Sequence, residues 1–122
     1  MKHPAVTTNA ELRAAVVATN GQTEQIGTWD VSLIEDFNNV LSGTSGPTWL
    51  RTWNPDLSGW DVAKGKDFHN MLGSAHSFDQ DLSEWNLSQA TRLDGMFHNT
   101  DMDDATHCPA PHPGFPADCS AW

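Results

Sequence analysis

A repeated block is the feature of this chain that most restricts how it can fold. The ten residues from Trp53 to Val62 match the ten from Phe78 to Leu87 at an offset of 25, with aromatic, Asp, Leu, Ser and Trp residues in the same places. A third, shorter copy begins at Ile26, which is equivalent to Leu57 at an offset of 31. Repeats of about 20 to 50 residues are typical of chains whose units stack, because no unit can bury its apolar face alone. We therefore expect stacking to make the core.

Two hydrophobic periods recur within each copy. Trp29, Trp60 and Trp85 are equivalent, and the residues around them alternate with the period of two typical of a short strand. Eight residues after each tryptophan, a large apolar residue is followed three and four residues later by two more, which is the spacing of a helix face. These triplets are Phe37, Val40 and Leu41; Phe68, Met71 and Leu72; and Leu93, Met96 and Phe97. Each unit is predicted to be a short strand, a short helix and a return loop, an α/β repeat with the tryptophans stacked in its core.

Both ends of the array carry sequences that suit caps. Thr8 and Glu11 form a capping box that opens a helix, and Asn20-Gly21 ends it. Its inward face is predicted to be Leu12, Ala15, Val16 and Thr19. We predict one domain over residues 1–122, made of an N-terminal helical cap (1–25), three repeats (26–101) with an insertion near 43–53, and a C-terminal cap loop (102–122).

Both cysteines lie in that last loop. Cys108 and Cys119 enclose a segment with four prolines, which cannot be helical. We predict a disulfide, which would stabilise the loop by roughly 2 to 3 kcal/mol and would indicate an oxidising compartment. The alternative is a metal site that adds His107 or His112 to the cysteines, although the C-x-x-C spacing of such sites is absent.

The charge of the chain excludes several kinds of partner. Six Lys and Arg residues stand against 16 Asp and Glu, a formal net charge of -10. Such a chain repels phosphate backbones and anionic lipid surfaces. No apolar run approaches the roughly 18 to 20 residues that span a bilayer. We expect no nucleic-acid binding and no membrane span.

The order of residues within the repeat is similar to a known pattern. The stretches from Trp60 to Leu72 and from Ser77 to Trp85 resemble the BspA-like surface-protein repeat family, also known as DUF285, whose units read W-D-V-S-N-V-T-D-M-x-x-M-F and then A-x-x-F-N-Q-D-L-S-x-W. The resemblance covers about residues 26–101 and is broken by the insertion. It implies a short leucine-rich-repeat-like solenoid of about three coils, an extracellular or cell-surface location, and partner binding rather than a reaction.

Aspartates recur in equivalent places and need an explanation. The columns are Asp30, Asp61 and Asn86; Asp36, Asp67 and Arg92; and Asp56 with Asp81. Stacked carboxylates repel unless a cation bridges them or backbone N–H groups bind them. We favour Asx turns, which need no ion. Calcium is the alternative, with Asp79, Asp81, Asp101, Asp103 and Asp104 as its best ligands.

The insertion holds the candidate contact residues. Trp49, Leu50 and Arg51 add apolar and cationic groups where the chain departs from its repeat, a composition typical of an interface hot spot. The alternative is that this loop folds back to fill a widened coil. No nucleophile or metalloprotease motif accompanies it, so we expect no enzymatic activity and no cofactor.

These observations predict a non-enzymatic interaction module that binds a protein or carbohydrate partner. The first alternative is a structural or accessory subunit of a larger multiprotein assembly. A further alternative is a calcium-binding solenoid.

Overall fold

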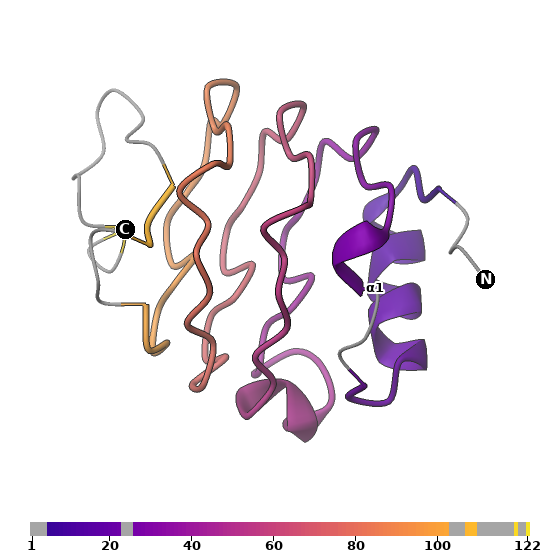
Figure 1. Cartoon of the computed structure of the whole chain (residues 1–122), viewed down its shortest axis with the longest axis vertical. Coiled ribbons are helices and arrows are strands. Elements are labelled where there is room, and N and C mark those ends of the chain that lie inside the picture. The colour runs from indigo at the N-terminus through magenta and orange to yellow at the C-terminus, as the bar shows by residue number, and fades with distance from the viewer. Residues whose placement is uncertain (1–4, 23–25, 103–106, 110–118, 120–121) are drawn as a thin grey trace.

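The repeated units lie side by side as successive coils, with a helix at one end of the row (Figure 1). The computed structural model describes residues 5–22, 26–102, 107–109, 119 and 122. Coils 1, 2 and 3 are residues 26–56, 57–81 and 82–102. The regular elements are the α-helix α1 (Asn9–Ala18) and two short 3-10 helices, η1 (Ile26–Thr28) and η2 (Thr48–Arg51).

The predicted α/β architecture is wrong. Among the described residues there is no strand. The β-type pairing between coils consists there of two isolated parallel bridges, Asp36 with Asp67 and Asp67 with Arg92. The helix expected after each tryptophan is absent from all three coils, which are turns and irregular backbone. A leucine-rich-repeat-like solenoid of strand and helix coils is therefore not supported.

Alternating hydrogen bonds explain why the coils are neither helix nor strand. Phe37 N–H donates to the carbonyl of Asp67 and Leu41 N–H to that of Met71, both at 2.8 Å, whereas Val40 N–H donates to Phe37 O, three residues back, at 3.3 Å. A helix bonds its N–H groups within its own turns, and a strand bonds them to a neighbour. Here successive N–H groups alternate between the two kinds of bond, so coils 1 and 2 are each locally turned and also bonded to the following coil.

One position in each coil interrupts any continuing helix. Asn39, Asn70 and Gly95 occupy equivalent places and have φ values of 58°, 54° and 72°. Left-handed backbone interrupts a right-handed helix, and Gly and Asn adopt it with the smallest conformational penalty. The Asn70 side-chain amide also donates to the Asn39 side-chain oxygen at 2.7 Å, which links coils 2 and 1.

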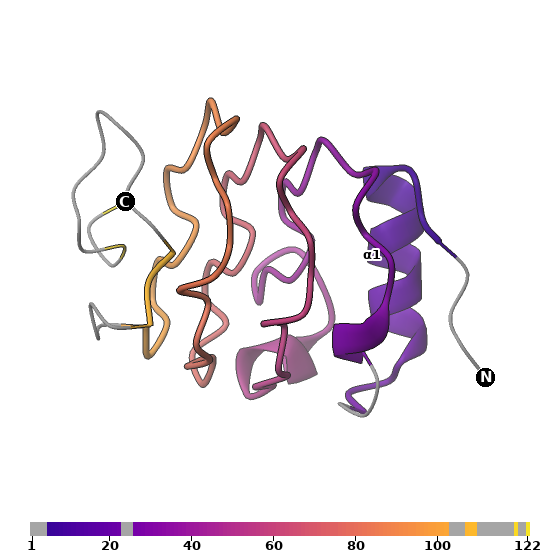
Figure 2. The ribbon, with the colours of Figure 1, turned by 45° about the horizontal axis from the view of Figure 1, so that its top comes forward.

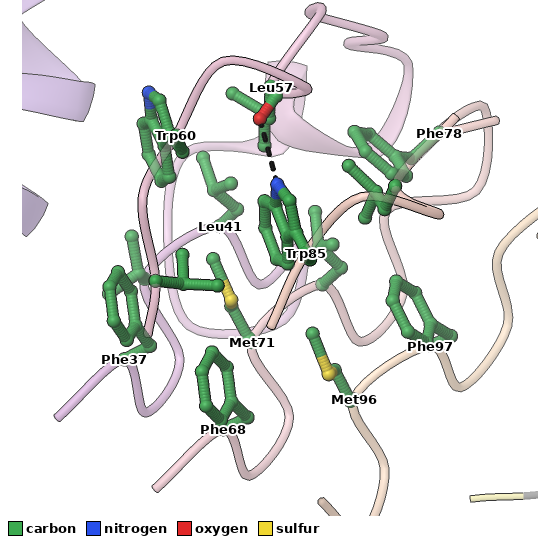
Figure 3. Packing of buried hydrophobic residues seen from close by; sticks show 14 of the residues in the cluster. Phe37, Leu41, Leu57, Trp60, Phe68, Met71, Phe78, Trp85, Met96 and Phe97 are labelled. Atoms are coloured by element: carbon green, nitrogen blue, oxygen red, sulfur yellow. Dashed lines mark hydrogen bonds between the residues drawn. The ribbon is translucent and has the colours of Figure 1, made fainter. Parts of the chain in front are cut away.

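The core is built from columns of equivalent apolar side chains (Figure 3). Phe37 and Phe68 stack with ring centroids 5.1 Å apart and planes within 6°. Trp85 is 2% exposed, and its indole N–H donates to the carbonyl of Leu57 in the preceding coil at 3.0 Å. Trp60 donates in the same way to the carbonyl of Ile26, at 2.8 Å. The tryptophan column therefore joins adjacent coils by hydrogen bonds as well as by packing.

The N-terminal helix is confirmed. Thr8 caps α1, since its hydroxyl accepts from Glu11 N–H at 3.1 Å, and the Glu11 carboxylate reaches back to Thr7 N–H at 3.0 Å. Of the four residues predicted to face inward, Leu12 and Val16 are buried, while Ala15 and Thr19 are half-buried. Figure 2 shows α1 lying along coil 1 at the end of the row.

Asn9 in α1 closes the outer edge of coil 1. Its side-chain amide donates to the carbonyls of Asp36 and Asn38, both at 3.0 Å. The equivalent carbonyls of coil 2, those of Asp67 and His69, accept instead from backbone N–H groups of coil 1. One amide thus replaces two donors that a preceding coil would supply.

Replacing Asn9 with alanine is expected to lower the free energy of unfolding by about 1 to 3 kcal/mol, because two carbonyls lose their donor. Chemical denaturation followed by tryptophan fluorescence measures the change. The control is Gln89→Ala, at an exposed position with no hydrogen bond to the described residues, which should alter stability by less than about 0.5 kcal/mol. An unchanged midpoint for Asn9→Ala would show that water satisfies these carbonyls equally well.

The predicted disulfide is confirmed. Cys108 and Cys119 are bonded, and both are buried. Trp122 meets the same end of the row, where its carbonyl accepts from Gly95 N–H at 3.3 Å and its ring lies against Phe97. The other residues of the predicted cap loop from 103 to 106 and from 110 to 118, with His112, lie outside the described part. No helix in that part is long and apolar enough to cross a bilayer.

Candidate functional site

The insertion leaves and rejoins coil 1 at one edge of the row, where η2 projects (Figures 1 and 2). Gly43 N–H still donates to Gly73 O at 2.9 Å, and the Arg51 carbonyl accepts from Ser77 N–H at 3.1 Å. Both ends of the insertion are therefore held against coil 2, and the residues between them form a fixed corner containing η2.

Trp49 is half-buried in this corner. Its ring meets that of Trp53 edge-to-face, with centroids 5.0 Å apart and planes at 89°. Gly21, just after α1, lies so close that an added Cβ would stand 3.5 Å from the indole. These contacts hold the Trp49 ring against the core, and the residue is left partly exposed.

Leu50 points the other way and is 3% exposed. With Trp53 and Phe78 it belongs to a closely packed apolar cluster between coils 1 and 2. The Trp53 indole N–H is buried there and has no hydrogen-bond partner among the described residues. Leu50 thus fills the coil that the insertion widens, as the alternative explanation of this loop expected.

Arg51 is exposed, and only one of its donors is used within the described structure. Its Nε donates to the carbonyl of Gly43 at 3.0 Å, which fixes the side chain across the base of the insertion. A guanidinium carries five N–H donors, so four remain for a ligand. The structure therefore leaves Arg51 exposed and Trp49 half-buried on the insertion, and it turns Leu50 into the core.

The recurring aspartates are explained by Asx turns, as predicted. In each column the side-chain oxygen accepts the N–H two residues ahead, as Asp36 does from Asn38 at 2.8 Å and Asp61 from Ala63 at 3.1 Å. The others that do so are Asp30, Asp56, Asp67, Asp81 and Asn86. These turns account for the columns without a cation.

The calcium candidates are not gathered into one site within the described chain. Asp81 is engaged with Ser83, and Asp79 pairs with His107 at 3.0 Å. Asp101 is exposed, while Asp103 and Asp104 lie outside the described residues. No group of three or more His, Cys, Asp or Glu side chains among the residues described is placed to hold a metal ion.

Serine side chains strengthen two of these turns. The Ser58 N–H and hydroxyl hold the pKa of Asp56 below its usual value, and the Ser83 hydroxyl and N–H do the same for Asp81. A lowered pKa favours the ionised form. The stabilisation is thus fully present above the usual pKa of a carboxyl and is lost as pH falls through the lowered one.

Ion pairs between adjacent coils form a second set of polar contacts, which the sequence analysis did not predict. Glu35 pairs with Lys66 at 2.8 Å, and His69 with Asp94 at 2.9 Å; each pair joins equivalent positions of adjacent coils. The sequence does indicate these pairs, since residues that can carry opposite charges stand one repeat length apart. The Lys66 hydrogen bond lowers the pKa of Glu35, but both side chains are more than half exposed, and exposed pairs add little stability.

The comparisons with known proteins give one result. Residues 10–106, well over half of the chain, match a family model described as "Mycoplasma protein of unknown function, DUF285". No curated protein and no solved structure matches.

Proposed function

This chain belongs to the DUF285 family, and we propose that it is a non-enzymatic interaction module that binds a protein or glycan partner through the insertion. The observation that carries the proposal is that the insertion, held at both ends, carries the half-buried Trp49 and the exposed Arg51. Tryptophan and arginine are the residues most enriched among binding hot spots.

Comparison with coil 2 supports a role for the insertion beyond stacking. Coil 2 turns the same corner from Ser74 to Ser77 with no added residues, and its N–H groups still bond to coil 3. Closing a coil therefore does not require the extra six residues. Leu50 anchors the insertion in the core. Trp49 and Arg51 are not needed for that anchoring and are the residues that a partner would contact.

The placement of polar groups favours binding over catalysis. Among the described residues, the buried polar side chains are those of Ser42 and Ser74, and neither is ionisable at neutral pH. Catalytic acids and bases are typically ionisable groups whose pKa is shifted in a partly buried cleft. Here no charged side chain among the described residues is buried, and several pair with one another or accept hydrogen bonds within turns.

The proposed location is outside the cell or on its surface. Disulfides persist in oxidising compartments and are rare in the cytosol, and the Cys108–Cys119 bond is formed and buried. This bond is what supports the location, alongside membership of the family.

Trp49→Ala and Arg51→Ala are expected to weaken partner binding by tenfold or more each, since hot-spot truncations cost about 2 kcal/mol or more. Binding would be measured on a glycan array and by biolayer interferometry against proteins that co-purify from the native source. Val17→Ala and Arg92→Ala, which remove an exposed apolar and an exposed cationic side chain elsewhere, are the matched controls and should bind as wild type.

Two outcomes would contradict this proposal. Equal losses in the insertion and control variants would place the binding surface elsewhere. Recovery of the chain only as a stoichiometric member of a defined complex, with the insertion variants still incorporated, would make it an accessory subunit instead.

A further inference from the structure

Four turns in the described chain share one layout, in which an Asp or Asn oxygen accepts the N–H of a serine two residues ahead. Three begin with aspartate, and the fourth begins with Asn86, whose oxygen accepts from Ser88 N–H at 2.9 Å. The aspartate turns run from Asp30 to Ser32, Asp56 to Ser58 and Asp81 to Ser83. The change to asparagine makes the fourth turn read Asn-Leu-Ser, the N-x-S acceptor sequence of N-linked glycosylation.

The hydrogen bond of the turn gives no reason for asparagine. A carboxylate accepts a stronger, charge-assisted hydrogen bond than an amide oxygen does. At Asp30 the carboxylate holds both the N–H and the hydroxyl of Ser32, at 3.0 and 2.6 Å, whereas at Asn86 the bond is to the Ser88 N–H. Asparagine is therefore the weaker choice for the turn, and its amide nitrogen is what it adds.

That nitrogen is presented to solvent. Asn86 and Ser88 are both exposed, while Leu87 between them is 2% exposed and anchors the turn in the core. The Asn86 oxygen is occupied by Ser88 N–H, and the Nδ2 group has no hydrogen bond to any described residue. A glycan attached at Nδ2 would displace no packed side chain.

The disulfide fits the kind of oxidising compartment that this modification requires. Disulfides form in the endoplasmic reticulum lumen and other oxidising spaces, and in eukaryotic cells oligosaccharides are transferred to asparagine in that same lumen. A chain that is secreted by such a cell and acquires the buried Cys108–Cys119 bond in that lumen would meet the transferase with Asn86 at its surface.

We propose that Asn86 is an acceptor for an N-linked glycan. In the transfer, Nδ2 attacks the anomeric carbon of a polyprenyl-diphosphate-linked oligosaccharide supplied by the secretory pathway. The new bond joins Nδ2 to that carbon, the bond from the carbon to the diphosphate oxygen breaks, and the polyprenyl diphosphate leaves. A base on the transferase takes the amide proton, and no oxidation or reduction occurs.

The test is secretion of the full chain from a eukaryotic host, followed by intact-mass measurement before and after treatment with an amidase that removes N-linked glycans. Wild type should carry one oligosaccharide that the amidase removes, leaving Asp at position 86. Asn86→Asp and Ser88→Ala should both be secreted without it. Ser88→Ala retains Asn86, so a mass change from deamidation alone cannot be mistaken for loss of the glycan.

The matched control creates the same tripeptide in an equivalent turn. Asp56→Asn gives Asn-Leu-Ser at an exposed position with a buried central leucine, and in an Asn86→Asp background it should restore one glycan. Wild type secreted at its unmodified mass, while the Asp56→Asn variant is glycosylated, would overturn the proposal. So would a glycan on wild type that survives Asn86→Asp.

Discussion

Replacing Trp85 with alanine is expected to lower the free energy of unfolding by about 3 to 5 kcal/mol, the range for truncating a buried aromatic side chain. Trp85 is 2% exposed and lies between side chains of coils 2 and 3 (Figure 3). Its loss opens a cavity at the centre of the row, and it also removes the donor to Leu57 O. Urea denaturation followed by circular dichroism, which does not depend on tryptophan emission, measures the change.

Trp85→Phe separates the two contributions. The ring is retained in part, so the expected loss falls to about 1 to 3 kcal/mol, the penalty for a carbonyl left without its donor together with a small cavity. Trp49→Ala is the control, because it removes the same side chain from a half-buried site outside the column. If Trp49→Ala proved as damaging as Trp85→Ala, the column would not be the main support of the stack.

Breaking the Cys108–Cys119 bond is expected to lower the free energy of unfolding by about 2 to 5 kcal/mol. The two cysteines are 11 positions apart and 5% and 0% exposed, so the bond closes a loop and joins it to the core. The double variant Cys108→Ala with Cys119→Ala removes the bond without burying new hydroxyl groups. Thermal unfolding of this variant, compared with wild type, gives the size of the effect.

Reductant supplies the control. Dithiothreitol should lower the melting temperature of wild type toward that of the double variant, and should leave the double variant unchanged. A wild-type melting temperature that does not move under conditions in which free-thiol titration shows complete reduction would contradict the expected contribution of the bond.

Much of the stacking register could be predicted from the sequence because equivalent residues occupy equivalent positions. Phe37 lies on Phe68, and Trp60 and Trp85 lie buried in one column with a half-buried Trp29 at its end. The capping box and the disulfide were predictable for a similar reason, since each depends on local residues of specific chemistry.

The helix in each repeat was predicted wrongly because apolar spacing is not unique to helices. Phe37, Val40 and Leu41 have the three- and four-residue spacing of a helix face, yet Asn39 between them has φ 58°. Consecutive turns bring the same residues to one side. The asparagine was visible in the sequence, but its left-handed backbone is stabilised by a bond to the next coil, from its N–H to His69 O at 3.1 Å, which only the assembled stack provides.

The location of the insertion was predictable, but the orientation of its side chains was not. Composition identified the insertion, and nothing in three consecutive residues says which of them turns inward. Leu50 does so because apolar side chains of coils 1 and 2, among them Phe78, surround it there. Asn9 was also beyond prediction, since its partners at Asp36 and Asn38 are remote in sequence.

The two bridges that join the coils span different lengths of chain. Asp36 and Asp67 are 31 positions apart, Asp67 and Arg92 are 25 apart, and yet both pairs are in parallel register. The six extra residues of coil 1 are accommodated within the insertion and do not shift the register of the coils. A peptide grafted between Ser74 and Ser77 of coil 2 would therefore project beside that insertion. The row thus offers adjacent attachment points for recognition loops, whose lengths can diverge in evolution or be chosen by a designer without altering the scaffold beneath them.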